Sequence, residues 1–114
     1  MDFKYIKLEI FIPSTHLRPL QIALADVDAG HIGNYDCALS YSKVTSTWRP
    51  LEGADPYSGE VGQLSEEEEL KVEVTVSRDR VDETIRAIKK IHPYEEPVIN
   101  AIPLYRTARD VREV

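Results

Sequence analysis

The sequence predicts an α+β domain of the ferredoxin-like class, with the element order β-α-β-β-α-β. Four segments are rich in apolar and strand-forming residues, and two of them alternate strictly between apolar and polar side chains. Two further segments carry apolar residues at helical spacing. Right-handed connections then give an antiparallel four-stranded sheet ordered 4-1-3-2, with both helices on one face. The predicted strands are 3–12, 35–43, 70–76 and 98–104, and the predicted helices lie between Pro19 and Gly30 and over 79–91.

The ends of the first strand and the first helix are predicted from prolines, candidate capping residues and a glycine. Pro13 ends the alternation, and Ser14 and Thr15 are candidate helix caps. Proline has no N–H for an interior helical bond, so the regular helix is expected to begin close to Pro19. We expect Gly30 to end this helix in a left-handed conformation.

The second strand is joined to the third by a long polar connection, 44–67. The run Glu66-Glu67-Glu68-Glu69 is interpreted as a solvated loop that leads into the third strand. Cys37 is interpreted as a small packing residue within the second strand. A connection of this length exceeds the usual range for unstructured loops, which suggests a functional or interface role.

The second helix and the fourth strand complete the domain. Asp79 can cap the helix, and His92-Pro93 ends it because a residue before proline avoids the helical region. Pro97 and Pro103 flank and interrupt the fourth strand, which suits its predicted place at an edge of the sheet. We expect one domain over 1–105 and a C-terminal tail over 106–114. The tail is interpreted as a solvated helical turn or a frayed end, with arginines at 106, 109 and 112.

Composition excludes several classes of protein. The net charge of −6 argues against nucleic-acid binding, which depends on a basic surface. No apolar run approaches the ~20 residues of a membrane span, so no membrane association is expected. The single cysteine excludes an intrachain disulfide and fits a reducing compartment, so a cytoplasmic location is predicted.

The most chemically dense stretch is "HPYEEP", residues 92–97. The topology places it at one end of the sheet, together with His16 and the 44–67 connection. The segment "HIGNYD", residues 31–36, is placed at the opposite end. A site that uses both His92 and His31 would therefore have to form between subunits.

Two interpretations of "HPYEEP" stay open. Imidazole and carboxylate ligands suit a divalent metal ion, with His92 and Glu95 or Glu96 as candidate ligands, but the spacing matches no standard metal motif. Alternatively, the two prolines fix a tight turn and Tyr94 packs against the sheet. In the long connection, Arg49 can bind a carboxylate or phosphate, including the carboxylate of Glu52 in another subunit.

Three motifs in this order, "GHIGNYDCALS" (30–40), "WRPLEGADPYSGEVG" (48–62) and "HPYEEPVINAIPL" (92–104), carry a resemblance to one bacterial family. They resemble the small inserted domain of Nif-three-like proteins, also called GTP cyclohydrolase type homologues, in a free-standing version. The last motif is also similar to that of CutA, the trimeric divalent-cation-tolerance protein. The resemblance implies a CutA-like or PII-like fold and a trimer or higher assembly. It does not imply the dinuclear metal site, which in the full-length relatives belongs to the flanking domain.

The leading functional hypothesis is a non-catalytic, oligomeric binding or regulatory module for a small ligand or a divalent cation. No catalytic residue is assigned. A metal-assisted hydrolase that uses His92 and Glu95, and a purely structural assembly module, are the two alternatives. The candidate ligand-binding residues are Asn34, Tyr35, Asp36, Arg49, Glu52, Tyr94 and Glu96, and the candidate metal ligands are His92, Glu95 and His31.

Overall fold

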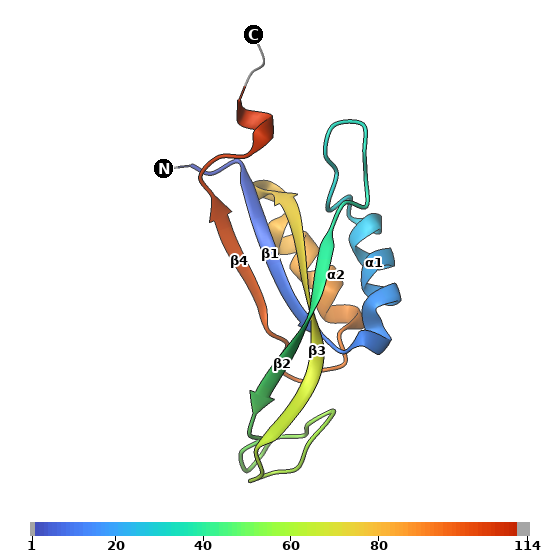
Figure 1. Cartoon of the computed structure of the whole chain (residues 1–114), viewed down its shortest axis with the longest axis vertical. Helices are drawn as coiled ribbons and strands as arrows, with labels where there is room; N and C mark the ends of the chain where they lie inside the picture. Colours follow the sequence, from blue (N-terminus) through green and yellow to red (C-terminus); the bar gives the residue numbers. More distant parts are fainter. Residues whose placement is uncertain (1, 112–114) are drawn as a thin grey trace.

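The computed structural model describes residues 2–111 and has the predicted order of elements (Figure 1). The four strands form one antiparallel sheet in the order β2-β3-β1-β4, which is the predicted 4-1-3-2 order counted from the other edge. Two helices cover one face of this sheet (Figure 1). The elements are β1 (Tyr5–Ile12), α1 (Leu17–Asp26), β2 (Ser40–Trp48), β3 (Ser65–Ser77), α2 (Val81–Ile91) and β4 (Ile99–Leu104).

The core lies between the sheet and the two helices. In β1 every second side chain is buried, from Ile6 to Ile12. These side chains lie opposite those of β3 from Val76 to Leu70, so the two central strands present one continuous apolar surface. Leu20 and Leu24 of α1 and Ile88 of α2 pack onto it from the helix layer. The period-two and helical patterns of the sequence therefore converge on one core.

The second strand begins five residues later than predicted. Ile32 and Tyr35 pair through their main chains across Gly33-Asn34, so this segment folds as a small hairpin of its own. Cys37 then adopts a left-handed φ of 56°, which is incompatible with a strand. The prediction of Cys37 as a packing residue in a strand was wrong, because its side chain is exposed and lies outside β2.

The run of four glutamates is part of β3, and its interpretation as a solvated loop was wrong. Glu66 to Glu69 pair with Thr47 to Val44 of β2, in a hairpin that extends beyond the helix layer (Figure 1). The alternating geometry of a strand sends successive glutamates to opposite faces of the sheet. Glu69 is 4% exposed, whereas its neighbour Glu68 is exposed. One acidic side chain of the run is therefore buried.

The helix ends also differ from the sequence prediction. The left-handed residue that ends α1 is Asp28, with a φ of 58°; Gly30 is also left-handed, with a φ of 78°, but lies two residues further along the chain. The N–H groups of Asp28 and Ala29 donate to the carbonyls of Ala25 and Leu24, which is the Schellman arrangement. Short 3-10 turns precede both helices, and their capping residues make no side-chain capping hydrogen bond. The tail begins with a 3-10 turn over Ala108–Asp110, and the prediction for Arg112 lies outside the described residues.

The molecule is long, with extents of 58 × 29 × 24 Å, and the β2–β3 hairpin forms one of its ends (Figure 1). The 92–98 connection lies at the end of the sheet where β1 finishes, beside the loop of the β2–β3 hairpin. The 27–39 loop lies at the opposite end, as the topology predicts (Figure 1).

Candidate ligand-binding site

A pocket of about 500 Å³ lies between the base of the β2–β3 hairpin, its folded-back loop and the 92–98 connection. Its walls are mostly aromatic side chains, prolines and small apolar groups, with a few carboxylates and one guanidinium. The first strand contributes Phe11, and the N–H of Phe11 donates to the carbonyl of Val98 at 3.1 Å across the pocket wall. The side chains that supply its aromatic and charged groups include Trp48, Arg49, Tyr57, Glu69, Tyr94, Glu95 and Glu96.

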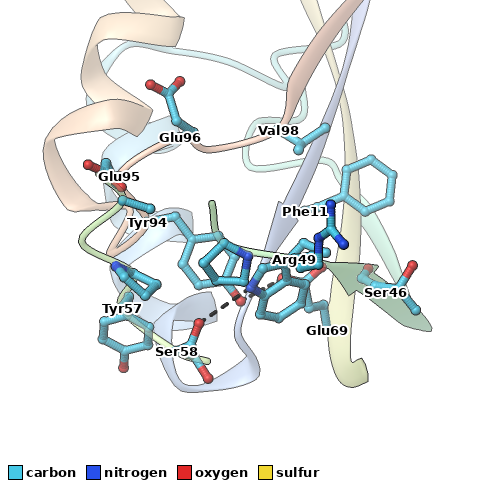
Figure 2. Close-up of a pocket in the computed structure, with 15 residues that line it drawn as sticks. Phe11, Ser46, Arg49, Tyr57, Ser58, Glu69, Tyr94, Glu95, Glu96 and Val98 are labelled. Carbon is cyan, nitrogen blue, oxygen red and sulfur yellow. Dashed lines mark hydrogen bonds between the residues drawn. The ribbon is translucent and has the colours of Figure 1, made fainter. Parts of the chain in front are cut away.

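Tyr94 is the centre of an aromatic cluster (Figure 2). Its ring centroid lies 5.9 Å from that of Trp48 and 5.8 Å from that of Tyr57, each at an interplanar angle of 48°. The ring of His92 lies 5.0 Å away, and Tyr57 in turn meets His16 edge-on at 6.0 Å. Tilted and edge-on contacts at these distances are the favoured geometries of aromatic pairs. The cluster joins three segments that are distant in sequence, around His16, from Trp48 to Tyr57, and from His92 to Tyr94.

The hydroxyl of Tyr94 donates a hydrogen bond of 2.6 Å to Oε2 of Glu69 (Figure 2). Glu69 is buried on the sheet face opposite the helices, where β3 leaves the core. Burial, and then the nearby carboxylate of Glu69, raise the pKa of Tyr94 above its usual value. The phenol is therefore held neutral as a donor to a buried carboxylate.

His92 uses both ring nitrogens to hold the main chain. Its Nε2 lies 2.7 Å from the carbonyl oxygen of Phe11, and the N–H of Tyr94 donates to Nδ1 at 3.2 Å. These partners fix the neutral tautomer with the proton on Nε2. Burial lowers the pKa of His92, which also favours this neutral form. His92 thus links the end of α2 to the end of β1 and helps to orient the Tyr94 ring.

The remaining candidates, from the long connection and from the "HPYEEP" segment, lie at the rim of the pocket or outside it. Glu95 accepts a hydrogen bond of 3.1 Å from the N–H of Asp55, which fastens the hairpin loop to the 92–98 connection. Glu96 and Arg49 are exposed and line the pocket. Glu52 is exposed and is not a lining residue.

The candidates of the "HIGNYD" segment form a separate cluster at the far end of the molecule. Nδ1 of His31 lies 2.9 Å from Oδ1 of Asp28, and its Nε2 lies 3.0 Å from the carbonyl oxygen of Gly33. The hydrogen bond to Asp28 is the largest cause of the raised pKa of His31. Tyr35 is 77% exposed, and Asn34 and Asp36 are also exposed. Among residues 2–111, no hydrogen bond or ion pair joins this cluster to the aromatic pocket.

A divalent metal ion does not fit the arrangement of one copy. Among residues 2–111 no group of three His, Cys, Asp or Glu side chains is placed to hold a metal. His92 would have to break a main-chain hydrogen bond to offer a lone pair, and His31 lies at the opposite end of the sheet. The metal-ligand roles of His92, Glu95 and His31 therefore stay a prediction that needs ligands from more than one copy.

Three residues of the site were missed from the sequence. The sequence assigned no role to Trp48 and Tyr57, although both lie in the 48–62 motif. Glu69 was predicted to lie in a solvated loop with the three preceding glutamates. The aromatic content of "WRPLEGADPY" was an available signal for the first two. Glu69 had none, because its burial depends on Tyr94, which follows 25 residues later.

A family model described as CutA1 divalent ion tolerance protein matches residues 57–113, which is half of the chain. The chain belongs to the CutA1 family. The matched half includes β3, α2, β4 and the "HPYEEP" segment. The resemblance to CutA that the last motif carries is therefore confirmed.

Longer proteins contain a domain similar to this CutA1-family chain. The "GTP cyclohydrolase 1 type 2 homolog" of Halalkalibacterium halodurans is 43% identical over 98 residues, which are 86% of this chain and 26% of the relative. A Bacillus cereus protein related to NIF3 has a structure with a TM-score of 0.80 and 35% identity, over 91% of this chain and 26% of that one. The chain spans about a quarter of the length of these relatives. The predicted resemblance to Nif-three-like proteins is confirmed.

The fold is also that of a separate CutA protein. The periplasmic divalent cation tolerance protein CutA of Archaeoglobus fulgidus has a TM-score of 0.71 at 19% identity, over 92% of this chain and 88% of that one. At this identity the likeness establishes the fold alone. In the part of the chain that the structure describes, neither helix is long and apolar enough to cross a membrane. The cytoplasmic location stays a prediction.

Proposed function

We propose that the chain is a non-catalytic binding or regulatory module, which holds a small ligand in the aromatic pocket and acts as a homo-oligomer. The observation that carries this proposal is the convergence of distant segments on one pocket around Tyr94. A volume of about 500 Å³ with mainly apolar walls and a few polar groups is typical of small-molecule sites.

The state of the titratable groups supports binding rather than acid–base chemistry. His92 donates and accepts main-chain hydrogen bonds, Tyr94 is held neutral, and Glu95 bonds the N–H of Asp55. A general base needs a free lone pair within reach of the substrate proton. These groups instead fix the shape of the pocket. The alternative of a metal-assisted hydrolase has less support, because it requires His92 to be released from its main-chain hydrogen bonds.

The family description connects relatives of this chain with divalent ions. A divalent ion as the ligand, or as a cofactor, is the second candidate. It would need an assembly in which Glu95 or Glu96 of one copy meets a further ligand from another. The aromatic pocket needs no second copy to be complete, so it is the preferred ligand site.

The sheet supports the proposal of an oligomer. Among the described residues, the face opposite the helices has no covering layer of helices or strands, although the 92–98 connection buries Glu69 near one end of it (Figure 1). The outer edges of β2 and β4 are also unpaired in this part of the chain. Four of the six residues of β4 are exposed, including Ile102 on the uncovered face at 36%. Natural proteins rarely leave such edges and apolar groups without cover. We expect a trimer or a higher assembly that covers this face.

Binding is tested with a thermal-shift screen of small ligands against the wild type, Tyr57→Ala and Tyr41→Ala. Tyr57 lines the pocket and is 56% exposed, so its removal should spare the fold, while Tyr41 is 53% exposed outside the pocket. A ligand at about ten times its Kd stabilises by about 1.4 kcal/mol. We expect this stabilisation in the wild type and Tyr41→Ala and its loss in Tyr57→Ala. Hits that Tyr57→Ala leaves unchanged would refute the pocket as the site.

Assembly is tested by light scattering over a wide range of protein concentration. We expect the mass of a trimer or more for the wild type. Ile102→Glu should lower the mass, because it places a charge on the uncovered sheet face. Ile22→Glu is the matched control, since Ile22 is 57% exposed on α1 in the helix layer. A monomer at every concentration would refute the oligomer.

A further inference from the structure

A buried carboxylate faces the aromatic pocket with one oxygen free. Glu69 is 4% exposed, and Tyr94 donates to its Oε2. Among residues 2–111 no hydrogen bond or ion pair reaches its Oε1. In this range, the fully buried side-chain polar atom without a hydrogen-bond partner is Nε of Arg80. Oε1 of Glu69, which also lacks a partner, is therefore not fully buried and keeps some accessible surface. Because Glu69 lines the pocket, this oxygen is available to a ligand donor there.

The charges around the pocket are mainly negative. Besides Glu69, the carboxylates of Glu95 and Glu96 lie on its lining, and Glu67 is near enough to raise the pKa of Tyr94. Arg49 is the basic side chain on the lining, and it is exposed. A buried carboxylate without a cationic partner is costly, so the pocket favours a positive group near Glu69.

The walls favour an organic cation over a metal ion. The ring centroids of Trp48 and Tyr57 lie 5.9 and 5.8 Å from that of Tyr94, and all three residues line the pocket. Aromatic faces attract cations placed within about 6 Å of the ring centroid. A metal ion would need several oxygen, nitrogen or sulfur ligands instead, and no such group of three exists among the described residues. One carboxylate surrounded by aromatic rings is a site for a cation that carries its own apolar surface.

We propose that the pocket binds a small organic cation with N–H donors, such as an amidinium, a guanidinium or a primary ammonium group. One N–H donates to Oε1 of Glu69, and the body of the ligand packs against Trp48, Tyr57 and Tyr94. This inference rests on the proposed function, since it names the ligand class of the same pocket.

The test uses three probes of nearly equal shape: benzamidine, which is a cation, benzamide, which is neutral, and benzoate, which is an anion. Isothermal titration calorimetry on the full chain measures each Kd. A charge-assisted hydrogen bond is about twice as strong as a neutral one, so we expect benzamidine to bind at least about tenfold more tightly than benzamide. Benzoate should bind most weakly.

Glu69→Gln keeps an acceptor for Tyr94 and removes the charge, so it should reduce the preference for benzamidine to less than about threefold. Glu68→Gln is the matched control. It removes the same charge one residue away, but Glu68 is exposed on the other face of the sheet and pairs with Lys43 at 3.8 Å. The preference should persist in this variant.

The outcomes separate the ligand class from the site. If benzamide and benzamidine bind equally and Tyr57→Ala abolishes both, the proposed preference for a cation is refuted. The pocket would still be the binding site. A preference that Glu69→Gln leaves intact would also overturn the proposal. Absence of binding by all three probes would overturn the organic cation, whereas the pocket itself is judged by the thermal-shift screen with Tyr57→Ala. Dissociation of the oligomer by benzamidine would show that a basic side chain of a neighbouring copy fills the pocket. This result would refute the proposal that a small molecule is the occupant.

Discussion

Replacing Tyr94 with phenylalanine removes one hydroxyl and leaves the aromatic cluster in place. Glu69 then loses the donor of its 2.6 Å hydrogen bond while its carboxylate remains buried. A hydrogen bond to a charged group contributes about 1.5–3 kcal/mol to the free energy of unfolding. The pocket admits water, which can partly rehydrate the carboxylate. We therefore expect a loss of about 1.5–2 kcal/mol, in the lower part of that range.

This loss corresponds to a clear change in melting temperature. The entropy of unfolding is about 2.1 cal/mol/K per residue. For 114 residues, the expected fall in Tm is about 6–8 °C. All variants must be compared at one protein concentration, because an oligomer has a concentration-dependent Tm.

Urea unfolding, followed by far-UV circular dichroism and by the fluorescence of Trp48, is the assay. Trp48 is the sole tryptophan and its ring lies 5.9 Å from that of Tyr94, so fluorescence reports the site and dichroism reports the whole domain. Tyr35→Phe is the control: Tyr35 is 77% exposed, and the change should stay within about 0.5 kcal/mol of the wild type.

A double-mutant cycle decides whether the effect belongs to the hydrogen bond. In a Glu69→Leu background the Tyr94 hydroxyl has lost its acceptor, so Tyr94→Phe should cost less than about 0.5 kcal/mol there. The same cost in both backgrounds would refute the reasoning. So would a Tyr94→Phe variant as stable as the wild type.

The same pair predicts the response to alkali. Burial and the Glu69 carboxylate raise the pKa of Tyr94, so above pH 10 the folded chain keeps a proton that the unfolded chain releases. The stability that Tyr94 contributes is complete below about pH 10 and is lost as the pH rises further. The difference in stability between the wild type and Tyr94→Phe should therefore narrow above pH 10.

Two further predictions concern the framework of the site. Burial lowers the pKa of His92, so the unfolded chain takes up a proton at higher pH than the folded one, and stability should fall as the pH drops below 6.5. His92→Gln should flatten this fall in the urea midpoint between pH 7 and pH 5; an equal slope in both proteins would contradict the assignment. Gly30→Ala should cost more than about 2 kcal/mol, because φ is +78° and an added Cβ would collide with the carbonyl oxygen of Ala38. Gly53→Ala, at φ +97° in open space, isolates the backbone cost of about 1–2 kcal/mol, and equal urea midpoints for the two variants would show that the collision is relieved.

The sequence predicted the elements whose apolar pattern is determined by one core. The alternation in β1 and in the inner half of β3, and the helical stripes, converge on that core, so their order and pairing were predicted correctly. The start of β2 was not, because β2 has few apolar residues and its position depends on pairing with β3. The prediction of a loop at the four glutamates was wrong because it rested on their charge alone. Pairing with β2 in the hairpin overrides the preference of a charged run for a loop.

The candidate site was predicted in outline only. Topology correctly placed His16, the long connection and "HPYEEP" at one end of the sheet, and the contacts of Tyr57 with His16 and Tyr94 confirm this. The pocket itself was not predicted, because it depends on how the hairpin loop folds back. That path is set by contacts across 40 residues, such as the bond from Asp55 to Glu95.

The hydrogen bond between Phe11 and Val98 joins the pocket to an edge of the sheet. Val98 lines the pocket and directly precedes β4, the edge strand that a neighbouring copy would approach. If copies of the chain dock along β4, a ligand that displaced Val98 would also displace the docking edge. Thermodynamic linkage then requires reciprocity: if occupancy of the pocket strengthens association, association strengthens occupancy by the same factor. Through the wall shared by Phe11 and Val98, the concentration of ligand would then determine the oligomeric state of the chain.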